Sequence, residues 1–291
     1  EDVAYFTYGT FNRLADRLRH IFFLMIMMNP YEIVTQPAAQ YSDQIRLEIL
    51  LQEIQGTSNP LFVHVHFLAT HGPLFNITNR VFSSEQNKDI EWDVDTYDDA
   101  VLEFDSYVGK VIEVLKETGK WEDTILIIAS DHGQKWSPIR RLPLLIRFPE
   151  AENAGRIQAN TQNIDIAPTL LDYMKLPIPE WMQGDSLLGG FAEQRPIFVV
   201  DAAHVENQTI VQEKVKPPFY QFYYIQINYC EQWYRFYLNR NEWWYGVFED
   251  HTAPCSSAET PSGEQLLTWA TTHLETNGFD VSSLEGAALC K

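Results

Sequence analysis

The feature that most constrains this sequence is a run of apolar, mostly β-branched residues that ends in polar side chains. Residues 124–129 read Thr-Ile-Leu-Ile-Ile-Ala and are followed at once by Ser130-Asp131-His132-Gly133. Such a run predicts a buried strand of a parallel sheet, and ligands bind beyond the carboxyl ends of these strands. Carboxylate and imidazole groups bind divalent cations, and glycine permits a positive φ or a close backbone approach. The alternative interpretation is a strand that ends in an Asx turn.

Helix and strand patterns alternate around this run. Residues 94–119 have apolar side chains at helical spacing and end at Gly119, which predicts an amphipathic helix. Residues 141–149 predict a second buried strand, and residues 163–174 predict another helix. This alternation indicates the α/β class. The expected core positions of the first helix are Tyr97, Val101, Phe104, Val108, Val111, Ile112 and Leu115.

Several motifs follow one another between residues 59 and 188. They are Ser130-Asp131-His132-Gly133, Arg141-Leu142-Pro143-Leu144, Asp165-Ile166-Ala167-Pro168-Thr169-Leu170-Leu171 and Gly184-Asp185-Ser186-Leu187-Leu188. In this order they resemble the sulfatase branch of the alkaline phosphatase superfamily, and several agreeing motifs are more specific than one. The resemblance implies a mainly parallel sheet flanked by helices and a small C-terminal antiparallel sheet. We expect an α/β domain over residues 1–200 and an antiparallel meander with a terminal helix over residues 201–291.

The resemblance also implies a metal-dependent hydrolase of sulfate or phosphate esters. In such enzymes the positions of Asp131 and His132 bind a divalent cation, here Ca²⁺, Mg²⁺ or Mn²⁺. The histidine of a His-x-Pro motif contacts the ester group, and His71-Gly72-Pro73 supplies it after an expected strand at residues 61–68. Lys135 matches a second residue that contacts the ester. The cation and these groups would neutralise the charge of the transferred group.

The sequence departs from the family pattern in two places. Relatives begin with a strand ending in paired aspartates, followed by a Cys or Ser in a Cys/Ser-x-Pro-x-Arg motif that provides the nucleophile. Neither precedes the His71 segment, and none of Cys230, Cys255 and Cys290 is followed by x-Pro-x-Arg. Asp98-Asp99 lies in the expected long helix and is interpreted as a solvated helix face. We therefore expect either a fragment whose missing half completes a partly formed metal site, or an inactive sulfatase-like structural or interaction subunit.

Composition limits the partners of the chain. With 40 acidic and 21 basic residues, its formal net charge of −19 argues against nucleic acid. The apolar run at residues 20–28 is shorter than the roughly 20 residues of a membrane span, which predicts a buried segment or a surface for a protein partner. The pairing of the three cysteines stays open, because a disulfide and free thiols both fit the sequence. Sulfatase relatives are often exported, so the resemblance implies an extracytoplasmic location.

The C-terminal third contains three aromatic, β-prone runs. Residues 222–228, 232–238 and 242–248 predict an antiparallel meander, and residues 265–275 predict an amphipathic terminal helix. One face of the meander could bind sugars through its aromatic rings. The alternative, which the sequence favours, is that these rings form a packed core.

Overall fold

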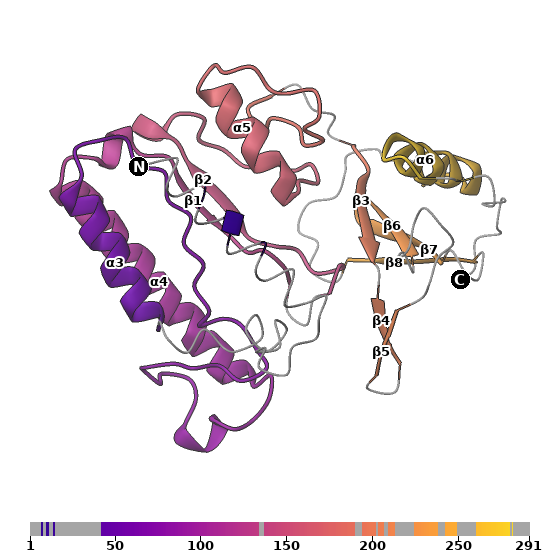
Figure 1. The fold of residues 1–291 in the computed structure, drawn as a ribbon. Helices are drawn as coiled ribbons and strands as arrows, with labels where there is room; N and C mark the ends of the chain where they lie inside the picture. Colours follow the sequence, from indigo (N-terminus) through magenta and orange to yellow (C-terminus); the bar gives the residue numbers. More distant parts are fainter. Residues whose placement is uncertain are drawn as a thin grey trace. The chain divides into compact units, whose positions relative to one another are not determined.

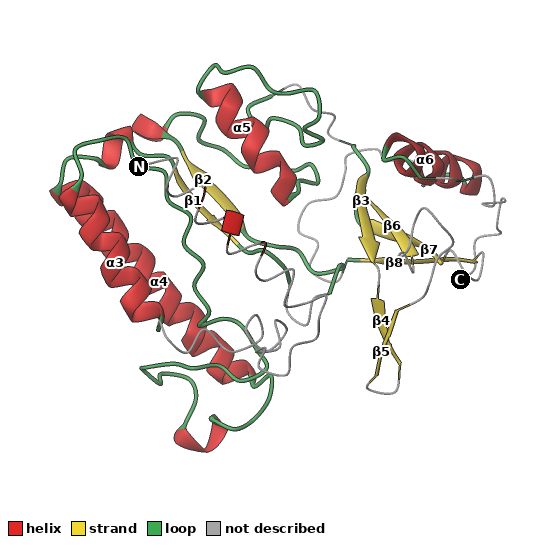
Figure 2. Ribbon diagram, viewed as in Figure 1, coloured by secondary structure: helices red, strands yellow, loops and turns green. Residues whose placement is uncertain are grey.

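The fold is described from a computed structural model. It describes residues 42–133, 137–189, 194–201, 203–206, 209–212, 224–237, 242–248 and 260–279, with Thr7, Thr10, Phe11, Leu14 and Val281. The chain divides into two compact units, residues 1–118 and residues 119–291, and each unit is treated by itself. Figure 1 labels the elements and Figure 2 colours them by type. The expected domain boundary between residues 200 and 201 stays a prediction.

In the first unit, two helices pack against each other: α3 (Asp43–Gly56) and α4 (Val94–Glu117) (Figure 1). The Asp93 carboxylate accepts a 2.9 Å hydrogen bond from the backbone N–H of Thr96 and caps the start of α4. Gly119 follows the helix with a φ of 71°. This left-handed conformation commonly ends a helix, and glycine adopts it most readily. The predicted helix is thus confirmed, although the expected core residue Val101 is 42% exposed. The side chains buried along α4 are Thr96, Asp99, Ala100, Tyr107, Val111, Val114 and Leu115.

The interpretation of Asp98-Asp99 as a solvated pair is wrong for Asp99. Asp98 is exposed, but Asp99 is only 1% exposed. One carboxylate oxygen of Asp99 accepts the backbone N–H groups of Val81 (2.8 Å) and Phe82 (2.9 Å), and the other accepts the N–H (3.0 Å) and hydroxyl (2.6 Å) of Ser83. Asp99 therefore fixes a loop that precedes the 3₁₀ turn η1 (Glu85–Asn87).

The expected strand at residues 61–68 is not formed in the described part of the chain. These residues carry no strand assignment, and Leu61, Phe62 and Val63 are 46%, 87% and 43% exposed. A strand requires a hydrogen-bonded neighbour, which the alternation of apolar residues cannot supply by itself. The end of the segment is nevertheless packed, because the Phe67 ring lies 5.8 Å from the ring of Phe104.

In the second unit, β1 (Leu126–Ala129) pairs antiparallel with β2 (Leu144–Arg147), with Leu126 opposite Arg147. The α/β class is confirmed, but the parallel pairing expected for this strand is not, since all strand pairs among the described residues are antiparallel. An apolar run shows that a strand is shielded from water and does not identify its neighbour. The remaining elements before residue 190 are η2 (Trp121–Asp123), η4 (Pro149–Ala151), η5 (Asn163–Asp165) and α5 (Ile166–Tyr173).

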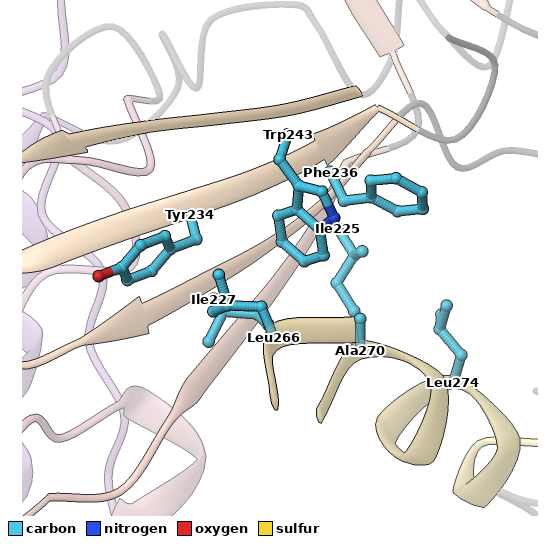
Figure 3. Close-up of a cluster of buried hydrophobic side chains, with 8 residues drawn as sticks. All are labelled: Ile225, Ile227, Tyr234, Phe236, Trp243, Leu266, Ala270 and Leu274. Atoms are coloured by element: carbon cyan, nitrogen blue, oxygen red, sulfur yellow. The ribbon is translucent and has the colours of Figure 1, made fainter. Parts of the chain in front are cut away.

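The C-terminal sheet has the order β3-β6-β7-β8, and β4 (Ala203–Glu206) and β5 (Thr209–Gln212) form a separate antiparallel pair. The sheet strands are β3 (Ile197–Asp201), β6 (Tyr224–Tyr229), β7 (Gln232–Tyr237) and β8 (Glu242–Val247). One face packs on α6 (Gly263–Thr276), as Figure 3 shows. The predicted meander and terminal helix are confirmed. The core residues in this figure are Ile225, Ile227, Tyr234, Phe236, Trp243, Leu266, Ala270 and Leu274.

None of the helices in the described ranges is long and apolar enough to cross a membrane. The apolar run at residues 20–28, with the protein partner expected there, lies outside those ranges. Cys230 is disulfide-bonded. Cys255 and Cys290 lie outside the described residues.

Candidate metal centre at the end of strand β1

The turn after β1 brings the side chains of Asp131 and His132 together. The backbone N–H of His132 donates a 2.9 Å hydrogen bond to Oδ1 of Asp131, and the Ser130 hydroxyl donates to the carbonyl of His132 at 2.7 Å. The other carboxylate oxygen of Asp131 lies 3.8 Å from Nε2 of His132. These side chains are 56% and 34% exposed, so solvent reaches both of them.

The imidazole of His132 is oriented by the carbonyl of Gly133. Its Nδ1 lies 3.0 Å from that carbonyl oxygen. Because a carbonyl can only accept, Nδ1 donates, and in the neutral ring the lone pair is then on Nε2. A hydrogen bond of this kind on one ring nitrogen is the usual support for a metal on the other. Metal–ligand bonds of about 2.0–2.6 Å allow two ligands of one cation to lie up to about 5 Å apart, which the 3.8 Å separation satisfies.

Two further residues shape this turn. The side-chain amide of Asn163 in η5 donates to the backbone carbonyls of Ser130 at 2.9 Å and Asp131 at 3.4 Å. A Cβ on Gly133 would lie 3.0 Å from Cβ of Arg140, so glycine at this position allows Arg140 to lie close to the backbone of the turn. Sequence reasoning missed Asn163. Its position two residues before the Asp165 motif was a signal, but nothing local shows that its amide reaches a turn 33 residues earlier.

An ion cluster around the buried carboxylate of Asp165 holds η5 in place. The carboxylate of Asp165 is fully buried, accepts the backbone N–H groups of Gln162 (2.8 Å) and Asp185 (3.0 Å), and pairs with Arg195. Arg195 also pairs with the carboxylate of Asp185. A Cβ on Gly184 would lie 2.1 Å from a backbone carbonyl oxygen of η5. The cluster therefore joins the Asp165 and Gly184 motifs and supports the element that carries Asn163.

The turn before His71 is fixed by the first residue of α3. The backbone N–H of His71 donates to the carbonyl of Leu68 at 2.9 Å, and the Asp43 carboxylate accepts the N–H groups of Leu68 (2.7 Å) and the next residue (2.6 Å). The His71 side chain is exposed. His71 belongs to the first unit and Asp131 and His132 to the second, so the expected role of these three residues in one site stays a prediction.

The donors at β1 fit only part of a metal site. A hard divalent cation takes about six to eight oxygen ligands. Across the described ranges, no group of three or more His, Cys, Asp or Glu side chains is placed to hold a metal ion. Asp131 and His132 thus have the residue types and the spacing of two ligands of one cation. Lys135, the other predicted site residue, lies outside the described residues.

Family models match most of this chain. The model described as Sulfatase matches residues 9–176, and the model described as N-sulphoglucosamine sulphohydrolase, C-terminal, matches residues 134–243. The chain is similar to the N-acetylglucosamine-6-O-sulfatase of Bacteroides thetaiotaomicron, with 35% identity over 100 residues, 30% of this chain and 18% of that protein. It is also similar to the steryl-sulfatase of Homo sapiens, with 28% identity over 182 residues, 53% of this chain and 30% of that protein.

A solved structure shares the fold. It is that of Ps i-CgsB in complex with k-i-k-neocarrahexaose, with a TM-score of 0.52 and 16% identity over 84% of this chain and 55% of that chain. The present chain spans less than a third of the length of the curated relatives above.

Proposed function

We propose a function from the premise that this chain belongs to the sulfatase family, a branch of the alkaline phosphatase superfamily. In this proposal the chain carries part of the active centre of a metal-dependent hydrolase of sulfate esters, with phosphate esters as the second substrate class. Asp131 and His132 bind a divalent cation, either Ca²⁺, Mg²⁺ or Mn²⁺. His71 and Lys135 contact the ester group.

The observation that carries the proposal is the geometry of the turn after β1. Oδ2 of Asp131 and Nε2 of His132 are 3.8 Å apart, and the hydrogen bond from Nδ1 to Gly133 leaves Nε2 with its lone pair. An Asx turn would have the Asp131 carboxylate accept the backbone N–H of Gly133, two residues on, whereas the bond here comes from the N–H of His132. The oriented imidazole beside the second carboxylate oxygen of Asp131 is the arrangement that a metal site needs.

Each site residue has a distinct task in this proposal. The bound cation would stabilise negative charge on the ester oxygens as a Lewis acid. Asp131 provides an anionic ligand and His132 a neutral nitrogen ligand, while the amide of Asn163 holds the backbone carbonyls of Ser130 and Asp131 in position. His71 and Lys135 bind the ester group and hold it in place, and their N–H groups donate to its oxygens.

The sequence does not provide the family's nucleophile. No Cys or Ser in the 291 residues is followed by x-Pro-x-Arg, and the sulfur of Cys230 is held in a disulfide. We therefore expect this chain alone not to hydrolyse esters, since the reaction needs an activated nucleophile. The competing hypothesis, an inactive structural or interaction subunit, predicts in addition that Asp131 and His132 bind no metal.

We also propose an extracytoplasmic location. Disulfide bonds persist mainly in oxidising compartments, and the disulfide of Cys230 supports such a compartment for this chain.

Calorimetric titration of Ca²⁺, Mg²⁺ and Mn²⁺ into the 291-residue chain tests the proposal. Asp131→Asn removes an anionic ligand at nearly constant shape, so we expect it to weaken the affinity of the preferred cation by at least about tenfold. Lys135→Ala should leave this affinity nearly unchanged, because Lys135 contacts the ester in this proposal. Asp123→Asn, at the other end of the same sequence run, is a matched carboxylate control.

Indistinguishable titrations of the wild type and Asp131→Asn would remove the metal assignment. Such a result would favour the structural subunit. A loss of affinity in Asp123→Asn equal to that in Asp131→Asn would show that the cation responds to general negative charge and not to this pair.

A further inference from the structure

The face of the C-terminal sheet opposite α6 carries an arginine surrounded by aromatic rings. On β7 the guanidinium carbon of Arg235 lies 4.2 Å from the ring centroid of Tyr224, 5.3 Å from that of Trp233 and 6.0 Å from that of Tyr237. In the sheet register, Arg235 stands between Gln226 on β6 and Trp244 on β8. This face is the reverse of the packed face in Figure 3.

The hydrogen bonds of Arg235 leave two N–H groups of its guanidinium group available. Its Nε and Nη2 donate to the same oxygen of Gln226 at 3.0 and 2.7 Å, and Nη1 donates to the hydroxyl of Tyr237 at 3.3 Å. A guanidinium group has five N–H bonds. Two of them remain, one on each Nη, and arginine uses N–H groups of this kind to bind pairs of oxygens.

The two sides of this face differ in exposure. On the β6 side, Gln226 is 0% and Tyr224 is 5% exposed, and the Gln226 side-chain amide donates to the carbonyl of Pro138 at 3.3 Å. On the β8 side, Trp244 is 46% exposed, and Gly246 leaves room for the indole of Trp233, which a Cβ would meet at 2.6 Å. Arg235 is therefore fixed from one side and open toward an exposed indole on the other.

Arg235 forms no ion pair with a carboxylate among the described side chains. None of its hydrogen-bond acceptors there is a carboxylate. Glu242 stands on the same face, but its carboxylate is 3.5 Å from the indole nitrogen of Trp244 and forms no ion pair with Arg235. In a chain with a net charge of −19, an ordered arginine without a carboxylate partner is suited to an anionic ligand.

We propose that Arg235 and Trp244 form a binding site for a sulfated saccharide on this face of the C-terminal sheet. The two remaining N–H groups of Arg235 donate to oxygens of the sulfate group, and the apolar face of the sugar ring packs on Trp244. The choice of a sulfate ester over other anions rests on the proposed function. The site itself does not depend on the cation, because no part of it touches Asp131 or His132.

Ligand-observed NMR with N-acetylglucosamine 6-sulfate in the presence of EDTA tests this site on the 291-residue chain. We expect binding by the wild type and weaker binding of unsulfated N-acetylglucosamine and of inorganic sulfate. Arg235→Ala and Trp244→Ala should each reduce the affinity by roughly tenfold, since the first removes the contact with the sulfate group and the second the contact with the sugar ring. Arg235→Lys keeps the charge but loses the paired donors, and should reduce it by a smaller factor. Trp181→Ala, at an indole that is 76% exposed, is the matched control.

Equal binding by the wild type, Arg235→Ala and Trp244→Ala would overturn the site, as would the absence of binding in EDTA. Binding that requires Ca²⁺ and is lost in Asp131→Asn, but not in Trp244→Ala, would place the saccharide at the metal centre. That outcome would overturn this inference and leave the proposed function standing. Trp244→Ala changes an exposed side chain, so its result stands even if Arg235→Ala fails to fold.

Discussion

Replacing Arg195 with alanine is expected to lower the free energy of unfolding by about 3–5 kcal/mol. Arg195 is 8% exposed and pairs with Asp165, which is fully buried. Removing only the cation leaves a buried carboxylate without its counter-charge, and this costs far more than the net contribution of an intact pair. Urea denaturation followed by tryptophan fluorescence measures the change.

Two variants control this prediction. Arg195→Lys keeps a cation but cannot pair with Asp165 and Asp185 through two nitrogens of one planar group, so we expect an intermediate loss. Glu85→Ala removes a surface ion pair with Arg80, in which the glutamate side chain is 80% exposed, and should change stability by less than about 1 kcal/mol. A loss below about 1 kcal/mol for Arg195→Ala would show that the cluster does not hold η5 in place.

Asp99→Asn is expected to destabilise the protein by roughly 2–4 kcal/mol at neutral pH. The two oxygens of Asp99 accept three backbone N–H groups and one hydroxyl from residues 81–83. Asparagine has a single oxygen, so its NH₂ group would face donors and leave them unsatisfied. Asp98→Asn changes the neighbouring, exposed carboxylate in the same way and should alter stability by less than about 0.5 kcal/mol.

The contribution of Asp99 should also depend on pH. Burial alone would raise the pKa of its carboxyl group, but the hydrogen bonds from Ser83, Phe82 and Val81 outweigh burial and lower the pKa from 3.8 to about 2. Because the folded-state pKa is the lower one, the stabilisation is present above pH 3.8 and is lost as the pH falls toward 2. The difference in unfolding free energy between the wild type and Asp99→Asn should therefore shrink between pH 4 and pH 2. A difference that stays constant over this range would contradict the role of the ionised carboxylate.

Elements with a clear local pattern could be predicted from the sequence. Helix α4 has apolar residues at helical spacing and a glycine stop, and the three strands β6, β7 and β8 are aromatic runs separated by short stretches of the sequence. The turn at Asp131 and His132 could also be located, because its polar residues end an apolar run abruptly. These features depend on residues that are close together in the sequence, and the local pattern of residue types records them.

Features that depend on distant partners could not be predicted in this way. The antiparallel pairing of β1 with β2, the buried position of Asp99 and the pairing of Arg195 with Asp165 each require a residue far along the chain. Asp98 and Asp99 have the same charge and adjacent positions. They differ because the loop at residues 81–83 covers and binds the carboxylate of Asp99, whereas that of Asp98 stays in solvent. Hydrophobic periodicity describes only neighbours in the sequence and therefore does not predict such contacts.

The metal assignment is tested most directly by anomalous X-ray diffraction from crystals of this chain soaked in Mn²⁺. We expect an anomalous peak at about 2.0–2.6 Å from a carboxylate oxygen of Asp131 and from Nε2 of His132, and no such peak in crystals of Asp131→Asn. A peak on other residues, or none in the wild type at saturating Mn²⁺, would contradict the claim that the turn after β1 is a metal centre.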